Sequence, residues 1–375
     1  MCEVSVFCLT YNHEKYVSRA IESFLAQETT FAYEIIIHDD ASTDSTVDIL
    51  KYYKKKYPDK LKLIIEKNNQ YSKGGIFDIR NQMLKKMKGK YIAFCEGDDF
   101  WIDNQKLQKQ WEAMELHEEC DMCACGGLTF SEDGIKAISQ IRPRFSTGIL
   151  EIQEVILGGG QYIVSAGMFF RRNVWKKPMD FQKIIAIDYA TQIRGALRGG
   201  IWYIDEKMAA YRRNANGSWS ERVLKNKDNL RKQWVKEIEL LEVLDEDTGY
   251  IYHDSIVERL KSYTSFMDQL EERKKEVVNM VTSIEGGLYL WGMGRRGEEF
   301  EEFCNLEGII LDGVCDASNE HVGEITIFNN KVLNTCDVLI KADVILASND
   351  YVYNDLLNSD YSGVIVNLQQ YMPYG

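Results

Sequence analysis

The residues best suited to chemistry lie in one short segment, Cys95-Glu96-Gly97-Asp98-Asp99-Phe100-Trp101, where three carboxylates flank a glycine. Clustered carboxylates repel one another unless a cation lies among them. Mg²⁺ and Mn²⁺ prefer oxygen ligands and usually take one or two protein carboxylates together with phosphate oxygens. We therefore expect Asp98 and Asp99 to hold Mn²⁺ or Mg²⁺, with Asp98 preferred; the alternative is a solvated acidic loop. Such an ion would absorb the charge that develops on a departing diphosphate.

A second acidic segment, Asp39-Asp40-Ala41-Ser42-Thr43-Asp44, supplies further hydrogen-bond acceptors. Asp39 or Asp40 could accept from the imide N–H of uracil or from ribose hydroxyls, which predicts nucleotide contact. We assign Asp44 mainly to the first turn of the next helix, where a negative charge favours the helix dipole. Ser42 or Thr43 is expected to cap that helix.

A third polar segment is the tripeptide Thr10-Tyr11-Asn12. Thr10 and Tyr11 could line a base pocket, and Asn12 is expected to cap the helix that follows. By itself this tripeptide does not indicate a function. Its interest comes from its position directly after an apolar run, as with the two acidic segments.

These three segments each follow a predicted strand in an alternating series of strands and helices. We expect strands at residues 4–9, 34–38, 61–65 and 91–95, and helices at 16–25, 47–53 and 76–87. Such alternation predicts an α/β fold with a mostly parallel sheet and helices on both faces. Ligands of open α/β sheets bind at the carboxyl ends of the strands, where all three polar segments lie.

The chain is long enough for two or three domains, with 375 residues. We expect a larger α/β domain at residues 1–225 and a helical connector at 226–283, whose apolar stripe includes Leu230, Trp234 and Leu241. A smaller α/β unit is expected at 284–375, with strands at 288–291, 309–314, 344–347 and 364–367.

The smaller unit contains Gly292-Met293-Gly294-Arg295-Arg296-Gly297, which matches G-x-G-x-x-G between a predicted strand and a predicted helix at 298–304. Asp316 follows at an offset suited to a ribose-binding acid. The unit resembles small Rossmann-like domains of sugar-modifying proteins, but it is too short for a full dinucleotide fold. A structural or interaction role and nucleotide or nucleotide-sugar binding both stay open, and NAD(P)-dependent sugar modification is a further alternative.

Composition excludes several classes of function. The net charge of −13 argues against sequence-independent duplex binding, so we expect no nucleic-acid partner. The nine scattered cysteines indicate reduced thiols and a cytoplasmic protein. Cys120, Cys123 and Cys125 are interpreted as part of a buried strand, with a metal site as the alternative. No apolar run approaches the ~18 residues of a membrane span, and no signal peptide is expected.

Taken together, the three polar segments resemble the nucleotide-binding half of family 2 glycosyltransferases, which have the GT-A fold. The matching text is residues 5–27 (SVFCLTYNHEKYVSRAIESFLAQ), 34–46 (EIIIHDDASTDST) and 89–101 (GKYIAFCEGDDFW). The resemblance covers roughly residues 1–225. It implies that Thr10, Asp39 and Asp40 contact uridine, with Tyr11 and Asn12 beside them. Glu96, Asp98 and Asp99 match the acidic metal motif, although Glu96 stands where Asp is usual, which shifts that contact toward ribose or water.

The same resemblance implies further site residues in the rest of the domain. Asp188 matches the carboxylate base that removes the proton of the attacking acceptor hydroxyl, and its alternative is a surface residue. Arg212 or Arg213 would pair with the diphosphate. Many relatives have a metal-binding His where Asn214 stands, which weakens coordination from that side. Arg80-Asn81 resembles a donor-site pair.

The resemblance therefore implies an inverting, metal-dependent hexosyltransferase that uses a UDP-sugar in the synthesis of surface polysaccharide or glycan. The acceptor would be a glycan or a lipid-linked glycan. Basic stretches at residues 171–177 and 222–236 are compatible with peripheral binding at the inner face of the cell membrane, and with solvated helices equally. A homo-oligomer is left open. The alternative from another class is a nucleotide-sugar sensor or scaffold without transfer activity.

Overall fold

The computed structural model describes residues 2–185, 188–213, 215, 227–263, 266–283, 285–318, 321–348 and 350–368. The chain divides into two compact units, residues 1–259 and 260–375. The boundary falls inside the segment predicted as a connector. Helix α9 (Lys227–Asp247) belongs to the first unit, whereas α11 (Phe266–Glu272) and α12 (Lys274–Thr282) belong to the second. A separate connector domain stays a prediction.

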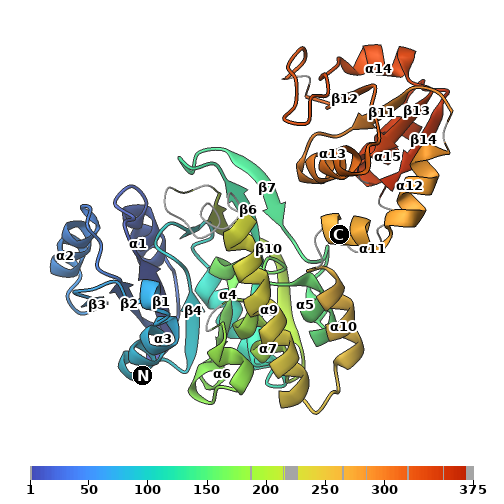
Figure 1. Cartoon of the computed structure of the whole chain (residues 1–375). Coiled ribbons are helices and arrows are strands. Elements are labelled where there is room, and N and C mark those ends of the chain that lie inside the picture. The colour runs from blue at the N-terminus through green and yellow to red at the C-terminus, as the bar shows by residue number, and fades with distance from the viewer. Residues whose placement is uncertain are drawn as a thin grey trace. The chain divides into compact units, whose positions relative to one another are not determined.

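The first unit is built on a ten-stranded sheet with the order β3-β2-β1-β4-β9-β6-β10-β5, with β7 beside β6 and β8 beside β10 (Figure 1). The bounds are β1 (Cys2–Thr10), β2 (Ala32–Asp39), β3 (Leu61–Ile65), β4 (Tyr91–Phe94), β5 (Phe100–Trp101), β6 (Met122–Phe130), β7 (Ala137–Ile141), β8 (Gly148–Leu150), β9 (Phe169–Arg171) and β10 (Ile201–Arg212). Strands β3, β2, β1 and β4 are parallel. Antiparallel β9 joins them to the parallel pair β6 and β10.

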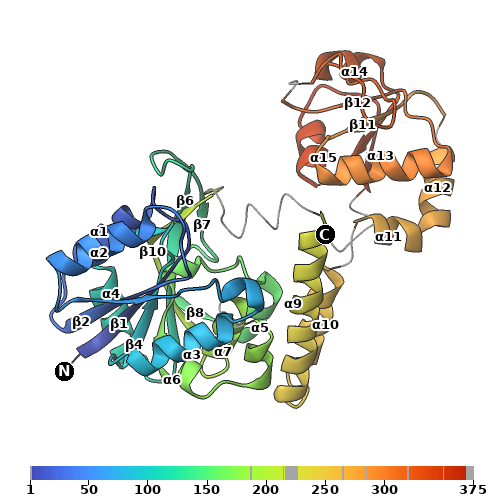
Figure 2. The same ribbon diagram turned by 60° about the vertical axis from the view of Figure 1, so that its left-hand side comes forward.

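Helices cover both faces of this sheet, as the alternating pattern predicts (Figure 2). The helices of the unit are α1 (Val17–Leu25), α2 (Thr46–Lys56), α3 (Ile76–Lys86), α4 (Lys106–Leu116), α5 (Ile152–Gly158), α6 (Asn173–Lys176), α7 (Tyr189–Ala196), α9 and α10 (His253–Lys261). Helices α1, α2 and α4 pack on the face of β1 that carries Val4, Val6 and Cys8. The opposite face presents Phe7, whose ring lies 5.1 Å from that of Trp175 in α6. Strand β1 is thus buried on both faces.

Register brings the three polar segments to one edge of the sheet. Thr10 at the end of β1 pairs with Asp39 at the end of β2, and Phe7 pairs with Phe94 at the end of β4. Beyond the strands, the Gly97 N–H donates to the Leu9 carbonyl at 2.8 Å. The loops after β1, β2 and β4 therefore meet at the carboxyl edge, which is the usual ligand edge of a parallel sheet.

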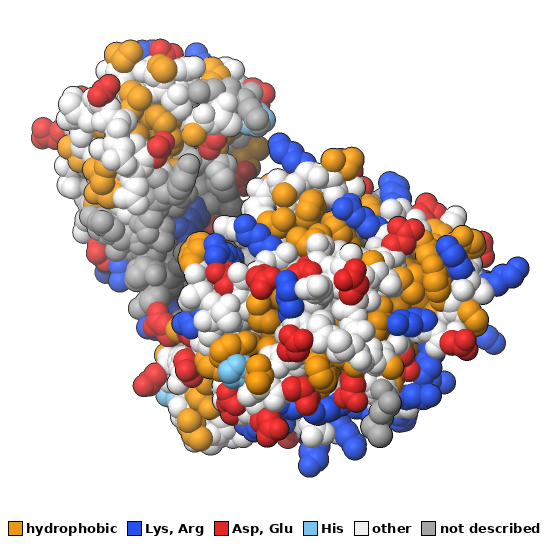
Figure 3. All heavy atoms as spheres, turned by 180° about the vertical axis from the view of Figure 1, so that it is seen from behind, with side chains coloured by type: hydrophobic (Ala, Val, Ile, Leu, Met, Phe, Trp, Pro, Cys, Tyr) orange, Lys and Arg blue, Asp and Glu red, His pale blue; other side chains and the backbone are white. Residues whose placement is uncertain are grey.

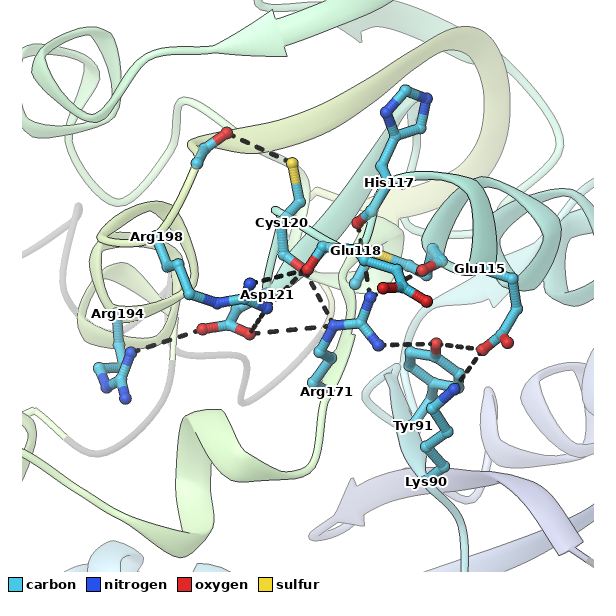
Figure 4. A network of polar contacts seen from close by, with 12 residues as sticks. Lys90, Tyr91, Glu115, His117, Glu118, Cys120, Asp121, Arg171, Arg194 and Arg198 are labelled. Carbon is cyan, nitrogen blue, oxygen red and sulfur yellow. Dashed lines mark hydrogen bonds and ion pairs between the residues drawn. The ribbon is translucent and has the colours of Figure 1, made fainter.

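The opposite edge is closed by a polar network around Asp121, directly before β6 (Figure 4). The Asp121 carboxylate lies 2.6 Å from Arg198 Nη2 and 3.9 Å from both Arg171 Nε and Arg194 Nη1. Arg171 also donates to the Tyr91 hydroxyl at 2.9 Å, so the network ties β9 to β4. Strand β6 follows this network and contains Cys123 and Cys125, and Cys120 lies just before it. All three cysteines are fully buried, which confirms that this segment is a buried strand.

The second unit has a four-stranded parallel sheet in the order β12-β11-β13-β14. Its strands are β11 (Leu288–Trp291), β12 (Gly313–Cys315), β13 (Val344–Ala347) and β14 (Val364–Asn367), and its other helices are α13 (Arg295–Glu307), α14 (Thr335–Lys341) and α15 (Asp350–Leu357). The predicted strand at 309–314 is wrong at its start, because Ile310 is 82% exposed and lies in the turn after α13.

The glycine-rich turn of the second unit is tight. Gly292 has a φ of 105°, and a Cβ on Gly297 would lie 1.8 Å from the Gly292 carbonyl oxygen. The Met293 N–H donates to the Asp316 carboxylate at 3.0 Å, so this acid joins β12 to the turn. A Rossmann-like nucleotide site in this unit stays a prediction. No helix among the described residues is long and apolar enough to cross a membrane.

Acidic and basic side chains are interspersed over the larger unit on the face shown in Figure 3. That face therefore presents no broad field of one sign, as a phosphate backbone would require.

We predict that Asp121→Ala lowers the free energy of unfolding by about 2–4 kcal/mol, because it leaves three arginines facing one another without a counter-charge. Chemical denaturation would measure the change. The matched control is Asp48→Ala: its side chain is 87% exposed and lies 4.0 Å from Lys51, so a change below about 0.5 kcal/mol is expected. Equal small effects of both substitutions would contradict the role of the network.

Candidate active site

The acidic loop after β4 is held close to the loop after β1. An ideal Cβ on Gly97 would lie 2.9 Å from His13 Nδ1 and 3.0 Å from Thr10 Cβ. Only glycine therefore allows this approach without displacing its neighbours. The loop that carries the three predicted acids, Glu96, Asp98 and Asp99, thus lies directly against the predicted base-pocket residue Thr10.

Asp98 and Asp99 have different surroundings. The Asp98 carboxylate is 12% exposed, lies 3.9 Å from His13 Nε2, and makes no hydrogen bond within the described part of the chain. Asp99 is buried, and its Oδ1 accepts the Arg212 N–H at 2.8 Å while its Oδ2 has no partner among the described residues. Burial, reinforced by the charge of Asp98, raises the pKa of Asp99 well above its usual range. Asp98 is therefore the better-suited metal ligand of the pair.

Arg212 holds the acidic loop in place. It is 2% exposed, its Nε donates to the Asp98 carbonyl at 2.8 Å, and its Nη1 donates to the Glu132 carbonyl at 2.6 Å. Its guanidinium also lies 4.7 Å from the centre of the Tyr16 ring. These contacts commit Arg212 to the protein, so Arg213, whose side chain is exposed, is the freer of the two predicted phosphate partners.

The acids after β2 organise the neighbouring loops. Asp39 is fully buried, and burial raises its pKa although its Oδ1 accepts the Ser42 N–H at 3.0 Å. The carboxylate of Asp40 accepts from the backbone N–H groups of Gln70 at 2.7 Å and Tyr71 at 2.9 Å. Both predicted nucleotide contacts therefore also shape the pocket wall, and any contact with a ligand would add to these bonds.

The predicted helix caps are wrong. Helix α1 begins after Tyr16 and α2 after Ser45. Asn12 instead joins the two loops: its N–H donates to Ser42 Oγ at 2.9 Å, and its Oδ1 accepts the Thr43 N–H at 2.8 Å. Asp44, as predicted, serves the start of α2, where its Oδ1 accepts the Thr46 N–H at 2.9 Å. The caps were mislocated because these loops run on for several residues beyond the strands.

Two further predicted residues lie at different depths. Tyr11 is 38% exposed beside the buried Thr10. Arg80 is fully buried in α3, where its guanidinium lies 4.2 Å from the Phe77 ring centre and 5.8 Å from that of Trp175. Burial lowers the pKa of Arg80 to about 10. The Arg80 guanidinium thus lies among aromatic side chains of α3 and α6, and its role at the donor site stays a prediction.

Asp188 lies at the start of α7, with its carbonyl accepting the Gln192 N–H at 2.9 Å. Its φ of 46° is unusual for a residue other than glycine. Its Oδ1 is buried and has no partner among the described residues, and burial raises its pKa to about 6. The charge of Asp188 contributes, after burial and the charge of Asp98, to the raised pKa of Asp99. Asn214 lies outside the described residues.

His13 is the site residue that the sequence reasoning missed. Its Nε2 faces Asp98, while its Nδ1 is buried without a partner among the described residues. The chain has five histidines, and this one directly follows the tripeptide Thr10-Tyr11-Asn12. That proximity was the available signal.

Four buried polar atoms at this edge have no hydrogen-bond partner within the described chain: Thr10 Oγ1, His13 Nδ1, Asp99 Oδ2 and Asp188 Oδ1. Unsatisfied buried groups are costly, and these four belong to residues of the candidate site, where a ligand could supply the missing partners. The described residues include no group of three or more His, Cys, Asp or Glu side chains that could hold a metal unaided. A cation at Asp98 therefore fits only if ligand oxygens complete its coordination, as Mg²⁺ commonly requires.

The parallel sheet with an acidic loop at its ligand edge defines an α/β fold of the glycosyltransferase type called GT-A. The family model described as glycosyl transferase family 2 matches residues 5–218. That match covers more than half of the chain, and the chain belongs to this family.

Individual proteins give the same picture. An uncharacterized protein of Mycobacterium tuberculosis is 33% identical over 216 residues, covering 58% of this chain and 60% of that protein. A UDP-Glc:α-D-GlcNAc-diphosphoundecaprenol β-1,3-glucosyltransferase of Escherichia coli is 41% identical over 115 residues, covering 31% of this chain and 42% of that enzyme. The crystal structure of residues 1–349 of S. aureus TarS with UDP aligns at 17% identity and a TM-score of 0.48, covering 73% and 92% of the two chains. The chain spans 60% of the M. tuberculosis protein and 42% of the E. coli enzyme.

We predict that Gly97→Ala weakens Mn²⁺ binding on the order of 10-fold or more, because the new methyl group displaces His13 or Thr10 from the acidic loop and small misplacements have large effects. Isothermal titration with Mn²⁺ and a nucleoside diphosphate would measure it. Gly148→Ala is the control, since a Cβ there approaches only Arg144 Nη1, at 3.7 Å. Unchanged affinity in Gly97→Ala would contradict the close packing of the two loops.

Proposed function

We propose that this family 2 glycosyltransferase is an inverting, metal-dependent hexosyltransferase that moves a sugar from a UDP-sugar to an acceptor hydroxyl. The observation that carries the proposal is the set of four unpartnered buried polar atoms around Asp98 and Asp99. A donor nucleotide and an acceptor hydroxyl would supply the missing partners. The proposal extends to surface polysaccharide synthesis, because the E. coli relative is named for a UDP-glucose donor and a diphosphoundecaprenol-linked acceptor.

The donor end of the site is assigned to the loops after β1, β2 and β4. Thr10, Tyr11, Asn12, Asp39 and Asp40 form the wall proposed to receive uridine, and Glu96 is proposed to reach the ribose. Asp98 would hold Mn²⁺ or Mg²⁺, which supplies Lewis-acid stabilisation of the diphosphate. Arg213 is the proposed phosphate partner, while Arg212 and Asp99 keep the loop in position.

The acceptor end is assigned to Asp188. A hydroxyl that attacks the anomeric carbon must lose its proton, and a carboxylate within hydrogen-bond reach can accept it. Burial brings the pKa of Asp188 to about 6, close to the working pH, which makes it a stronger base than an exposed aspartate. The carboxylate is ionised at neutral pH and therefore able to act.

The E. coli relative also supports a lipid-linked glycan as the acceptor. On that proposal the enzyme works beside the inner face of the cell membrane.

We predict that Asp98→Asn abolishes transfer and weakens Mn²⁺ binding in the presence of UDP on the order of 10-fold to 100-fold, because the substitution removes the charged ligand but keeps the shape. Isothermal titration and product analysis would measure both. Asp133→Asn is the control, since that acid is bonded to Ser131 and Ile135 in the exposed turn before β7. Full activity of Asp98→Asn, or of wild type in excess chelator, would refute metal dependence. Nucleotide binding without turnover on any acceptor would favour a sensor.

We predict that Asp188→Asn abolishes transfer while raising the free energy of unfolding by about 1–3 kcal/mol at pH 8, because a buried charge is removed. The folded-state pKa of Asp188 is raised, so ionisation costs stability progressively from the unfolded pKa of about 4 to the folded pKa of about 6. The gain should therefore vanish near pH 4. In wild type, kcat/KM should fall as the pH drops below about 6, where the base of the free enzyme is protonated.

The control for Asp188→Asn is Asp180→Asn, whose carboxylate is 66% exposed beside Lys183. It should leave kcat unchanged and produce no gain of stability at pH 8. An active Asp188→Asn enzyme would refute the assignment of the base, whatever its stability.

A further inference from the structure

We propose that His13 is a protein ligand of the divalent ion, and that its Nε2 and the Asp98 Oδ2 oxygen hold the ion between them. The inference rests on the proposed function, since it requires a metal in the donor site. It adds a protein ligand from the loop after β1, whereas the ligands predicted from sequence, Asp98 and Asp99, both belong to the acidic loop after β4.

The separation of the two side chains supports this assignment. His13 Nε2 and Asp98 Oδ2 lie 3.9 Å apart, which is too far for a hydrogen bond. Two ligands at about 2.1 Å from an octahedral ion lie about 3.0 Å apart at a right angle and about 4.2 Å apart across the ion. The observed separation lies between these two values and is about 0.3 Å short of the arrangement across the ion, so a small side-chain movement would bring the two groups to opposite coordination positions. The two groups therefore face each other at a distance suited to an ion between them.

The orientation of the imidazole ring is fixed by its surroundings. Nδ1 is buried against Gly97, where an added Cβ would approach to 2.9 Å, and the ring lies 6.3 Å from that of Tyr16 in an edge-on arrangement. The His13 carbonyl accepts the N–H groups of Tyr16 and Val17, both at 2.9 Å, which anchors the residue at the start of α1. Nδ1 therefore packs against the backbone of the acidic loop, and Nε2 is the ring nitrogen that faces the Asp98 carboxylate.

The coordination of the ion follows from these two ligands. Nitrogen from His13 and oxygen from Asp98 leave the remaining positions to ligand phosphates and water, since the described residues include no three-ligand group. Affinity for the ion alone should then be weak, and a nucleoside diphosphate should raise it. The Oδ1 of Asp99 is engaged by the Arg212 N–H, which fixes the position of the loop.

The test uses full-length protein with ¹⁵N-labelled histidine, loaded with Mn²⁺ and UDP and studied by pulsed electron paramagnetic resonance. We expect a ¹⁵N hyperfine coupling typical of a directly bonded imidazole. It should persist in His321→Ala, a substitution of a histidine that is 58% exposed in the second unit, and disappear in His13→Ala. His13→Ala should also weaken Mn²⁺ binding in the presence of UDP on the order of 10-fold or more. Melting temperatures, and a second variant His13→Gln, separate loss of the ligand from loss of folding.

Two results would overturn the inference in distinguishable ways. If wild type binds Mn²⁺ with UDP, and Asp98→Asn abolishes that binding, but no histidine nitrogen is coupled, then His13 is not a ligand and the proposed function stands. If wild type binds no Mn²⁺ in the presence of UDP, the inference and the metal dependence of the proposed function fail together. A coupling that survives in His13→Ala would assign the ligand to another histidine and would also overturn the inference.

Discussion

The mutual repulsion of carboxylates at one edge of the sheet is the constraint on which the site depends. Burial is the largest cause of the raised pKa of Asp99, and the charges of Asp98 and Asp188 raise it further. Burial likewise raises the pKa of the Cys8 thiol, and the charges of Glu96, Asp98 and Asp99 add to that effect. The Arg212 backbone N–H and guanidinium oppose the shift of Asp99, so one arginine balances the charge of the acidic loop only in part. A divalent ion with its diphosphate is the class of ligand that completes this balance.

Several strands could be located from sequence because parallel strands buried on both faces appear as continuous apolar runs. Residues 61–65, 288–291, 344–347 and 364–367 were predicted with the bounds of β3, β11, β13 and β14. Strand β9 was not predicted, because Phe169–Arg171 is three residues long and pairs only with strands distant in sequence. Residues 309–312 carry an apolar pattern and Leu311 is buried, but Ile310 is exposed and the strand begins only at Gly313, so pattern alone misplaced the start of β12.

The acidic residues of the candidate site could be predicted from sequence, whereas the tertiary contacts that position them could not. Asp98 and Asp99 lie at a strand end in any parallel arrangement, but the sequence cannot tell which of them meets Arg212, since that residue is more than a hundred positions away. The commitment of Arg212 to the Asp98 carbonyl is a tertiary fact of the same kind. His13 was missed because a single histidine in a loop belongs to no periodic pattern. The orientation of its ring depends on the close approach of Gly97, which the sequence does not predict.

The two edges of the large sheet differ: one carries a network of ion pairs and hydrogen bonds, and the other carries strained loops. At the edge away from the acids, Asp121 hydrogen-bonds Arg198 and lies within ion-pair distance of Arg171 and Arg194, and Arg171 ties β9 to β4. At the ligand edge, Asn12, Ala41 and Asp188 all have positive φ values, of 55°, 64° and 46°. Such conformations cost of order 1–3 kcal/mol each and persist only where the surrounding structure imposes them. A closed network at one edge thus allows the other to keep strained loops and unpartnered polar atoms in place, and that arrangement is what a preorganised ligand site requires.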